Sequence, residues 1–273
     1  MSKTKSFEIS KREVWEAWKV VKKNRGGPGT DGQTLESYEQ DLANNLYKLW
    51  NRMASGCYMP MGVKRVEIPK PDGRTRPLGI PCVADRIAQA VVKRRMEPNL
   101  ERVFHRSSYG FRPHRSAKQA LMKARDNCWQ YAWVVDIDIK SFFDEIDHDL
   151  LLKAVRHHVS DSWVVLYIKR WLEAPVAYAD GRRESRHRGT PQGGVISPLL
   201  ANLFLHYAFD HWMERTSPMI EFERYADDSV PRAQCAARAA YVRAAQKMRV
   251  GPSKPPYRRR LQTTLSCQGK EPW

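Results

Sequence analysis

The chain has 273 residues, of which 47 are Lys or Arg and 30 are Asp or Glu, so its formal net charge is +17. Hydrophobic residues make up 42% of it and nine residues are tryptophan, which excludes a disordered chain, while the excess of positive charge favours a polyanionic partner, most simply nucleic acid. The five cysteines are widely spaced and include no Cys-x-x-Cys pair, which favours a reducing, cytoplasmic location without structural zinc. The sequence has no apolar run of membrane-spanning length, so no membrane partner is expected.

Two amphipathic helices are expected near the amino terminus. Ser10 and Glu13 have the spacing of a capping box at the start of the first helix, and apolar residues recur at helical spacing over residues 35–53. The glycine-rich segment 26–32 between them is a loop. A phosphate cradle and a plain connector are both open for this loop, and the connector is favoured because the Gly-Lys-Ser/Thr ending of a P-loop is missing.

A basic β-hairpin is expected over residues 63–80, around the turn sequence Lys-Pro-Asp-Gly at residues 70–73. Basic side chains on or beside it are Lys64, Arg65, Lys70, Arg74 and Arg76. They are either a clamp on phosphates or a solvated edge that charge protects from aggregation. A helix follows over residues 83–96 and is expected to end before Pro98.

Residues 109–115 interleave aromatic side chains with arginine, which suits contact with single-stranded nucleic acid or a base pair, although a packed loop is also possible. Ser116 is expected to cap the helix after this loop. Further on, a second hairpin is expected over 176–186, and a helix from Ser197 to about residue 214. The turn at 191–194 has two glycines, which would let the backbone approach a ligand closely.

An apolar strand over residues 133–144 carries Asp136 and Asp138, which share one face because they are two residues apart. A second acidic segment, Arg224–Asp228, lies far downstream. Each is possible as a solvated strand end or turn, but together they offer carboxylates from two chain segments, as a pair of divalent cations requires. A ligand set made of oxygen atoms favours Mg²⁺ over zinc.

Six segments resemble the reverse transcriptases encoded by bacterial group II introns, in the order found in that family, between about residues 10 and 228. They are residues 28–32 (Pro-Gly-Thr-Asp-Gly), 76–81 (Arg-Pro-Leu-Gly-Ile-Pro), 109–113 (Tyr-Gly-Phe-Arg-Pro), 138–144 (Asp-Ile-Lys-Ser-Phe-Phe-Asp), 190–194 (Thr-Pro-Gln-Gly-Gly) and 225–228 (Tyr-Ala-Asp-Asp).

The resemblance implies an α+β fold of the right-hand polymerase type. Fingers are expected over residues 1–132, a ferredoxin-like βαββαβ palm over 133–228, and a divergent basic tail without native structure over 229–273, with the thumb missing. The implied function is RNA-directed DNA synthesis on an RNA template, such as group II intron RNA, from a DNA primer and deoxynucleoside triphosphates.

The resemblance also implies roles for four acids. Asp138, Asp227 and Asp228 would be the catalytic residues and would hold two Mg²⁺ ions about 3.5–4 Å apart. One ion would activate the primer 3′-hydroxyl, and the other would steady the triphosphate and the departing pyrophosphate. Asp136 would lie at the edge of this site or support it.

Four further residues match positions that bind the incoming nucleotide in the family. Lys70 and Arg76 would hold its triphosphate. Phe143 would place its ring where a ribose 2′-hydroxyl would lie and so favour deoxynucleotides. Gln192 would line the nascent base pair.

The resemblance ends directly after Asp228. The next residues include Pro231, which cannot donate to a central β-ladder, and residues 229–273 hold ten Lys or Arg and one acid, Glu271. A change of reading frame and a genuine basic tail both explain this change, which falls inside a motif. With the strand after Asp228 and the thumb expected to be lost, primer extension is expected near background. A splicing cofactor without DNA synthesis, or an inactive fragment, is the alternative function.

Overall fold

The computed structural model describes residues 5–69, 73, 75–131, 133–134, 137–139 and 141–233. The chain divides into two compact units, each built from two separate stretches. The first unit takes in Met1–Leu100 and His148–Ser197, and the second takes in Glu101–Asp147 and Pro198–Trp273. None of the helices in the described ranges combines the length and the apolar composition needed to cross a bilayer.

The helices of the first unit follow local signals with two exceptions. They are α1 (Lys11–Asn24), α2 (Leu35–Gln40), α3 (Leu42–Ala54), α4 (Val83–Glu101), α7 (His148–His158) and α8 (Ser162–Glu173). The predicted capping box of α1 is confirmed: the Ser10 N–H donates to Glu13 Oε2 at 2.7 Å, and the Glu13 N–H donates to Ser10 Oγ at 3.2 Å.

The exceptions are helix boundaries. The single helix expected over residues 35–53 is wrong, because the backbone of Asp41 leaves the helical region (φ −125°, ψ 47°) between α2 and α3. The expected end of α4 before Pro98 is also wrong. Pro98 lies inside the helix, where the buried side chains of Met96 and Leu100 hold the last turn against the core.

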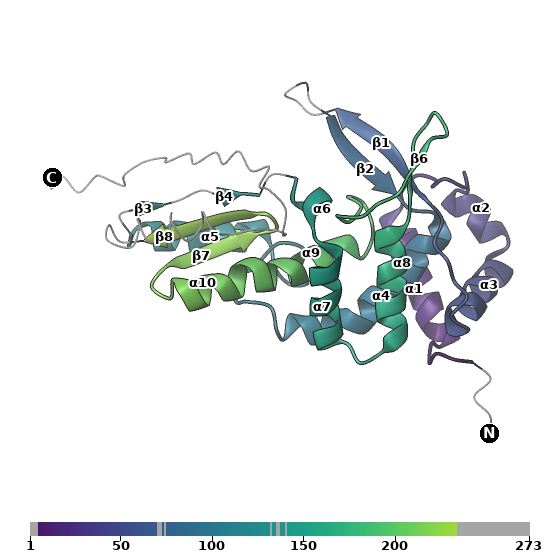
Figure 1. The fold of residues 1–273 in the computed structure, drawn as a ribbon, viewed down its shortest axis with the longest axis horizontal. Helices are drawn as coiled ribbons and strands as arrows, with labels where there is room; N and C mark the ends of the chain where they lie inside the picture. The colour runs from purple at the N-terminus through teal and green to yellow at the C-terminus, as the bar shows by residue number, and fades with distance from the viewer. Residues whose placement is uncertain are drawn as a thin grey trace. The chain divides into compact units, whose positions relative to one another are not determined.

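A four-stranded sheet completes the first unit, with strand order β2-β1-β5-β6. Both predicted hairpins are confirmed: β1 (Val63–Pro69) pairs with β2 (Thr75–Ile80), and β5 (Val176–Ala177) pairs with β6 (Arg183–Glu184). The hairpins join through a parallel pairing of β1 with β5. In Figure 1 the long β1–β2 hairpin is the blue pair of arrows.

A buried carboxyl lies in the core beneath these elements. Asp85 of α4 accepts hydrogen bonds from the Tyr58 hydroxyl and, at 3.1 Å, from the Met61 N–H. Trp171 of α8 donates to the Tyr58 hydroxyl at 3.2 Å. Burial raises the pKa of Asp85 from 3.8 to about 6, because the charged form is poorly solvated there.

The second unit is a sheet with helices packed on it. Its elements in chain order are α5 (Ala117–Cys128), β3 (Trp133–Val134), β4 (Ile137–Asp138), α6 (Phe142–Glu145), α9 (Ser197–Leu205), the π-helix η1 (His206–Asp210), α10 (His211–Thr216), β7 (Glu221–Tyr225) and β8 (Asp228–Ala233). The helix predicted from Ser197 to residue 214 is thus interrupted by one π turn. In Figure 1, α9 and α10 form one continuous green rod beside the β7–β8 hairpin.

Neighbouring residues of β7 contact different helices. Phe222 packs edge-on against Phe209 of η1, with ring centroids 5.2 Å apart. The next residue, Glu223, accepts a hydrogen bond at 2.7 Å from Asn127 of α5. Because successive strand residues point to opposite faces, α5 and the rod of η1 and α10 cover opposite faces of this hairpin.

The strand after Asp228 is present, so the expectation that it is lost is wrong. β8 pairs with β7 along one edge and with β4 and β3 along the other. Pro231 falls between the stretch paired with β4 (Asp228 and Ser229) and the stretch paired with β3 (Arg232 and Ala233). A missing N–H is tolerated best at such a position, which explains how a central strand accommodates the proline.

Asp85 generates a prediction about pH. Because its folded pKa lies above the unfolded value, its ionisation destabilises the fold; this effect is absent below about pH 4 and complete above about pH 6–7. We expect the unfolding free energy of the wild type, relative to Asp85→Asn, to fall by about 3 kcal/mol across that window. Urea denaturation at several pH values measures this difference. A difference that stays constant with pH would contradict the assignment.

Candidate active site

Two of the predicted catalytic acids are direct cross-strand neighbours. Asp138 of β4 lies opposite Asp228 of β8 in the antiparallel ladder. Asp227 is in the two-residue turn between β7 and β8, whose flanking residues Tyr225 and Asp228 are paired. Asp138 and Asp228 are exposed and Asp227 is half-buried. Acids from both acidic segments therefore lie at one end of the sheet of the second unit.

The turn that carries Asp227 has an unusual backbone. Ala226 has a φ of +56°, in the left-handed region that non-glycine residues rarely adopt. Such a conformation persists only where the surroundings impose it. Ala226, the first residue of the turn, is buried, whereas its neighbour Tyr225 is exposed. Asp227 and Asp228, which follow, lie at or near the surface.

The loop before α5 supplies part of these surroundings. Ser107–Tyr109 runs beside β7: the Tyr109 N–H donates to the Arg224 carbonyl and the Arg224 N–H donates to the Ser107 carbonyl, both at 2.8 Å. A Cβ atom added at Gly110 would overlap the backbone nitrogen of Ala226. Gly110 therefore lets this loop lie directly against the turn.

Arg112 of the same loop is bound by the protein itself. Its guanidinium donates to both carboxylate oxygens of Glu101 (2.9–3.2 Å) and to the carbonyls of His105 and Ser108 at 2.9 and 2.8 Å. Its side chain is 6% exposed. For Arg112, these contacts favour a role in packing the loop 109–115 over the alternative role in binding nucleic acid. Ser116 caps α5 as predicted, through a capping box with Gln119.

Phe143 lies in the second unit together with the three acids. It is buried on α6 and makes edge-on contacts with Phe111 and Phe142, at centroid distances of 6.2 and 5.7 Å. Phe111 is 46% exposed, so the aromatic pair reaches from the interior to the surface. The predicted role of Phe143 towards the sugar stays a prediction.

Two predicted nucleotide-binding residues contact each other in the first unit. Arg76 Nε donates to Gln192 Oε1 at 2.8 Å, and the Gly79 N–H donates to the Gln192 carbonyl at 2.6 Å. Gly193 (φ +114°) approaches the same strand so closely that a Cβ atom there would lie 2.6 Å from the Gly79 carbonyl oxygen. The close approach predicted for this turn is therefore made to the protein's own β2.

Two other predicted residues, Lys70 and Asp136, lie outside the described residues. In the glycine-rich loop 26–32, Thr30 donates to the Gly62 carbonyl at 3.0 Å, and Gly29 packs on the backbone of Cys82. Arg86 donates to the Gly27 carbonyl at 2.7 Å. These contacts fasten the loop to α4 and to the residues before β1.

The chemistry of the acidic donors fits Mg²⁺, which prefers oxygen ligands. Within the described ranges, no three His, Cys, Asp or Glu side chains are grouped so that they could hold a metal ion by themselves, and this includes the three acids of the second unit. Mg²⁺ is commonly held by one or two carboxylates together with substrate phosphates and water. Asp138, Asp227 and Asp228 fit such an open site, in which the substrate supplies the remaining oxygens.

Three buried residues near the turn were missed by sequence reasoning. Arg224, Asp210 and Asn202 are 0–1% exposed, and Arg224 donates hydrogen bonds to each of the other two. The available signal was weak: Arg224 lies in a strand that also holds two glutamates, so its charge does not stand out, and Asn202 and Asp210 are two polar residues in a largely apolar helical stretch. Partners separated by 14 and 22 residues cannot be read from local patterns.

Comparison with known proteins gives a consistent result. Residues 68–237 match the family described as "Reverse transcriptase (RNA-dependent DNA polymerase)". The chain is 39% identical over 206 residues to Protein YkfC of Escherichia coli, covering 72% of this chain and 53% of that protein. It is 35% identical over 182 residues to the group II intron-encoded protein LtrA of Lactococcus lactis, covering 66% of this chain and 30% of LtrA.

A third relative is the putative COX1/OXI3 intron 1 protein of Saccharomyces cerevisiae, 31% identical over 192 residues. That match covers 70% of this chain and 23% of the yeast protein. The chain thus spans about half the length of YkfC and less than a third of the two intron proteins.

The Gly110 contact generates a prediction about stability. A Gly110→Ala substitution should lower the free energy of unfolding by about 1–3 kcal/mol or more, because the methyl group would force the loop away from Ala226. The matched control is Gly27→Ala, where an added Cβ meets no atom within 4 Å. Chemical denaturation measures both variants. Equal stability of the two would show that the loop does not press on the turn.

Proposed function

Because the chain belongs to the reverse transcriptase family, we propose that it synthesises DNA on an RNA template from a DNA primer and deoxynucleoside triphosphates. The observation that carries this proposal is the pairing of Asp138 with Asp228 beside the turn that holds Asp227. The similarity to a group II intron-encoded protein supports intron RNA as the template.

We propose Asp138, Asp227 and Asp228 as the ligands of two Mg²⁺ ions. Bound Mg²⁺ would activate the primer 3′-hydroxyl and neutralise charge on the triphosphate. The role of the protein is to hold two of these carboxylates on a β-ladder and the third in the adjoining turn, so that the reacting groups are positioned before the reaction starts. Asp138 and Asp228 are exposed, so substrate and metal can approach this end of the sheet.

The nucleotide would be bound by residues from other segments. We propose that Lys70 and Arg76 hold its triphosphate, since fixed cations stabilise phosphate oxygens. The hydrogen bond from Arg76 to Gln192 supports a common site for these two, with Gln192 against the nascent base pair. Phe143 would exclude a ribose 2′-hydroxyl, a role that suits a buried, rigid ring.

We further propose the right-hand architecture, with fingers in residues 1–132 and a palm from residue 133. The palm would continue past residue 228 to Ala233, since β8 is a central strand of its sheet. The presence of this strand removes one reason to expect background activity. Incorporation of at least the first nucleotide is therefore expected.

The test is a substitution at Asp138. We expect Asp138→Asn to reduce single-nucleotide incorporation by more than about a hundredfold, because Mg²⁺ contributes several kcal/mol to the transition state. The assay uses an RNA template, a DNA primer, one deoxynucleoside triphosphate and Mg²⁺. The matched control is Asp126→Asn, an acid of α5 whose side chain is 55% exposed. The proposal fails if the wild type does not extend the primer, or if Asp138→Asn extends it as well as the control does.

A further inference from the structure

Arg224 is a fully buried cation next to the turn that carries Asp227. Its side chain is 1% exposed, and that of Asp210 is 0% exposed. Arg224 Nε donates to Asp210 Oδ1 at 2.8 Å, and Nη2 donates to Asp210 Oδ2 at 2.7 Å. A buried charge is tolerated when it is paired in this bidentate way, and the pairing fixes the plane of the guanidinium.

The remaining nitrogen of the guanidinium faces the turn. Arg224 Nη1 donates to the backbone carbonyl of Ala226 and to Asn202 Oδ1, each at 3.0 Å. Ala226 is the residue with the strained φ of +56°. The Ala226 carbonyl is therefore hydrogen-bonded to the guanidinium of Arg224, whose orientation is fixed by Asp210.

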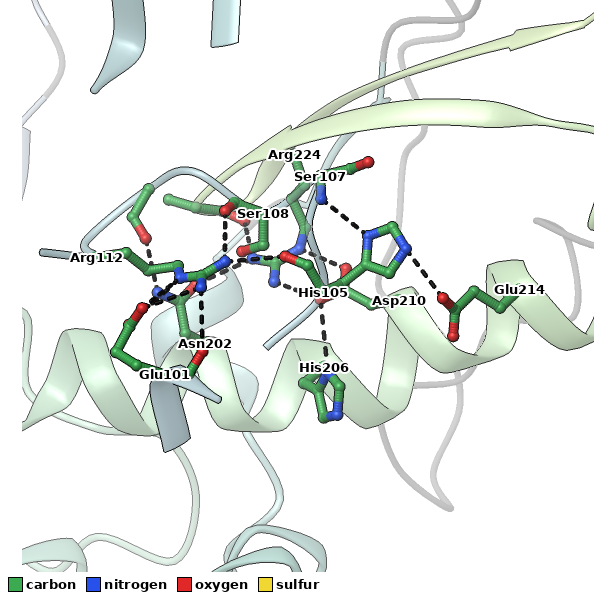
Figure 2. Close-up of polar contacts among 12 residues, drawn as sticks. Glu101, His105, Ser107, Ser108, Arg112, Asn202, His206, Asp210, Glu214 and Arg224 are labelled. Atoms are coloured by element: carbon green, nitrogen blue, oxygen red, sulfur yellow. Dashed lines mark hydrogen bonds and ion pairs between the residues drawn. The ribbon is translucent and has the colours of Figure 1, made fainter. Parts of the chain in front are cut away.

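Asn202 extends the network to the other side of the turn. Its Nδ2 donates to the Gly110 carbonyl at 2.6 Å. Gly110 is the residue that lies against the Ala226 nitrogen. The turn is thus held at its carbonyl by Arg224 and covered at its amide by Gly110, and Asn202 bonds to both. Figure 2 shows Asn202 and Asp210 on the helical rod, with Arg224 directed towards them.

The π turn explains how one rod presents both partners. In a regular α-helix of 3.6 residues per turn, positions eight apart differ by about 80° around the axis. The π-helix His206–Asp210 forms the second half of the stretch from Asn202 to Asp210, and its wider turn, with i→i+5 hydrogen bonds, reduces that angle. Both side chains then face Arg224. π turns of this kind are frequent at functional sites.

We propose that Arg224, fixed by Asp210 and Asn202, is a positioning residue that sets the backbone of the turn and so directs the carboxylates of Asp227 and Asp228 towards the metal site. The inference rests on the proposed function of those acids. Lysine at this position would keep the charge but could not donate at once to Asp210, Asn202 and the Ala226 carbonyl, because it has no planar fork.

The experiment compares Arg224→Lys and Asn202→Ala with the wild type. It measures Mn²⁺ binding by electron paramagnetic resonance, hydrogen exchange of the peptide containing residues 225–228, and the kcat and KM of single-nucleotide incorporation. We expect both variants to bind Mn²⁺ about 10- to 100-fold more weakly and to exchange faster in the turn. The kcat should fall while the KM for the nucleotide changes little.

The matched control is Arg86→Lys. Arg86 is also a buried arginine that donates to loop carbonyls, but it belongs to the first unit. This variant should lose stability and keep the wild-type Mn²⁺ affinity. Asn202→Ala leaves the Arg224–Asp210 pair in place, so it decides the question if Arg224→Lys does not fold.

The outcomes separate this inference from the proposed function. Unchanged Mn²⁺ affinity in a folded variant, with only the stability lowered, would overturn the positioning role. An absence of Mn²⁺ binding in the wild type would also overturn it. If Mn²⁺ binding responds as expected but the wild type does not extend a primer, the inference stands and the polymerase function fails.

Discussion

Hydrogen bonding along both edges of β8 is the constraint on which the candidate site depends. One edge pairs with β7 and closes the turn that carries Asp227, and the other edge pairs with β4 and places Asp138 opposite Asp228. Acids about ninety residues apart in sequence are thereby fixed at one end of a single ladder. A β-ladder suits this purpose because its register determines which side chains are neighbours.

Glycine residues allow the segments that resemble the family to pack closely against one another. In the second unit, Gly110 lies on the backbone of Ala226, and in the first, Gly193 lies on Gly79. In each case the space that a side chain would fill is occupied by a second motif. Glycine is required there for close packing, and the motifs of each unit are held together as one structure before any substrate binds.

Local signals in the sequence predicted much of the fold. The capping boxes at Ser10 and Ser116 and both hairpins of the first unit were predicted because a few adjacent residues determine them. Pro231 led to the wrong expectation that the strand after Asp228 is lost. Proline does lack the N–H that a β-ladder uses, but Pro231 lies between the two paired stretches of β8, and this position depends on distant strands.

The site was predictable only in part, for the same reason. The pairing of Asp138 with Asp228 agrees with the motif reading, whereas the buried partners of Arg112 and Arg224 come from distant segments and could not be inferred. The segment around Arg112 was expected to contact nucleic acid, but Arg112 binds a carboxylate and carbonyls of the protein itself.

We propose that Asp138 and Asp227 share one metal site at the end of this sheet. Anomalous diffraction from a crystal grown with Mn²⁺ tests it most directly. We expect an anomalous peak within roughly 2.5 Å of carboxylate oxygens from both residues, with Asp228 adjacent. A peak that contacts neither acid, or a crystal structure in which Asp138 and Asp227 lie in different regions, would contradict it.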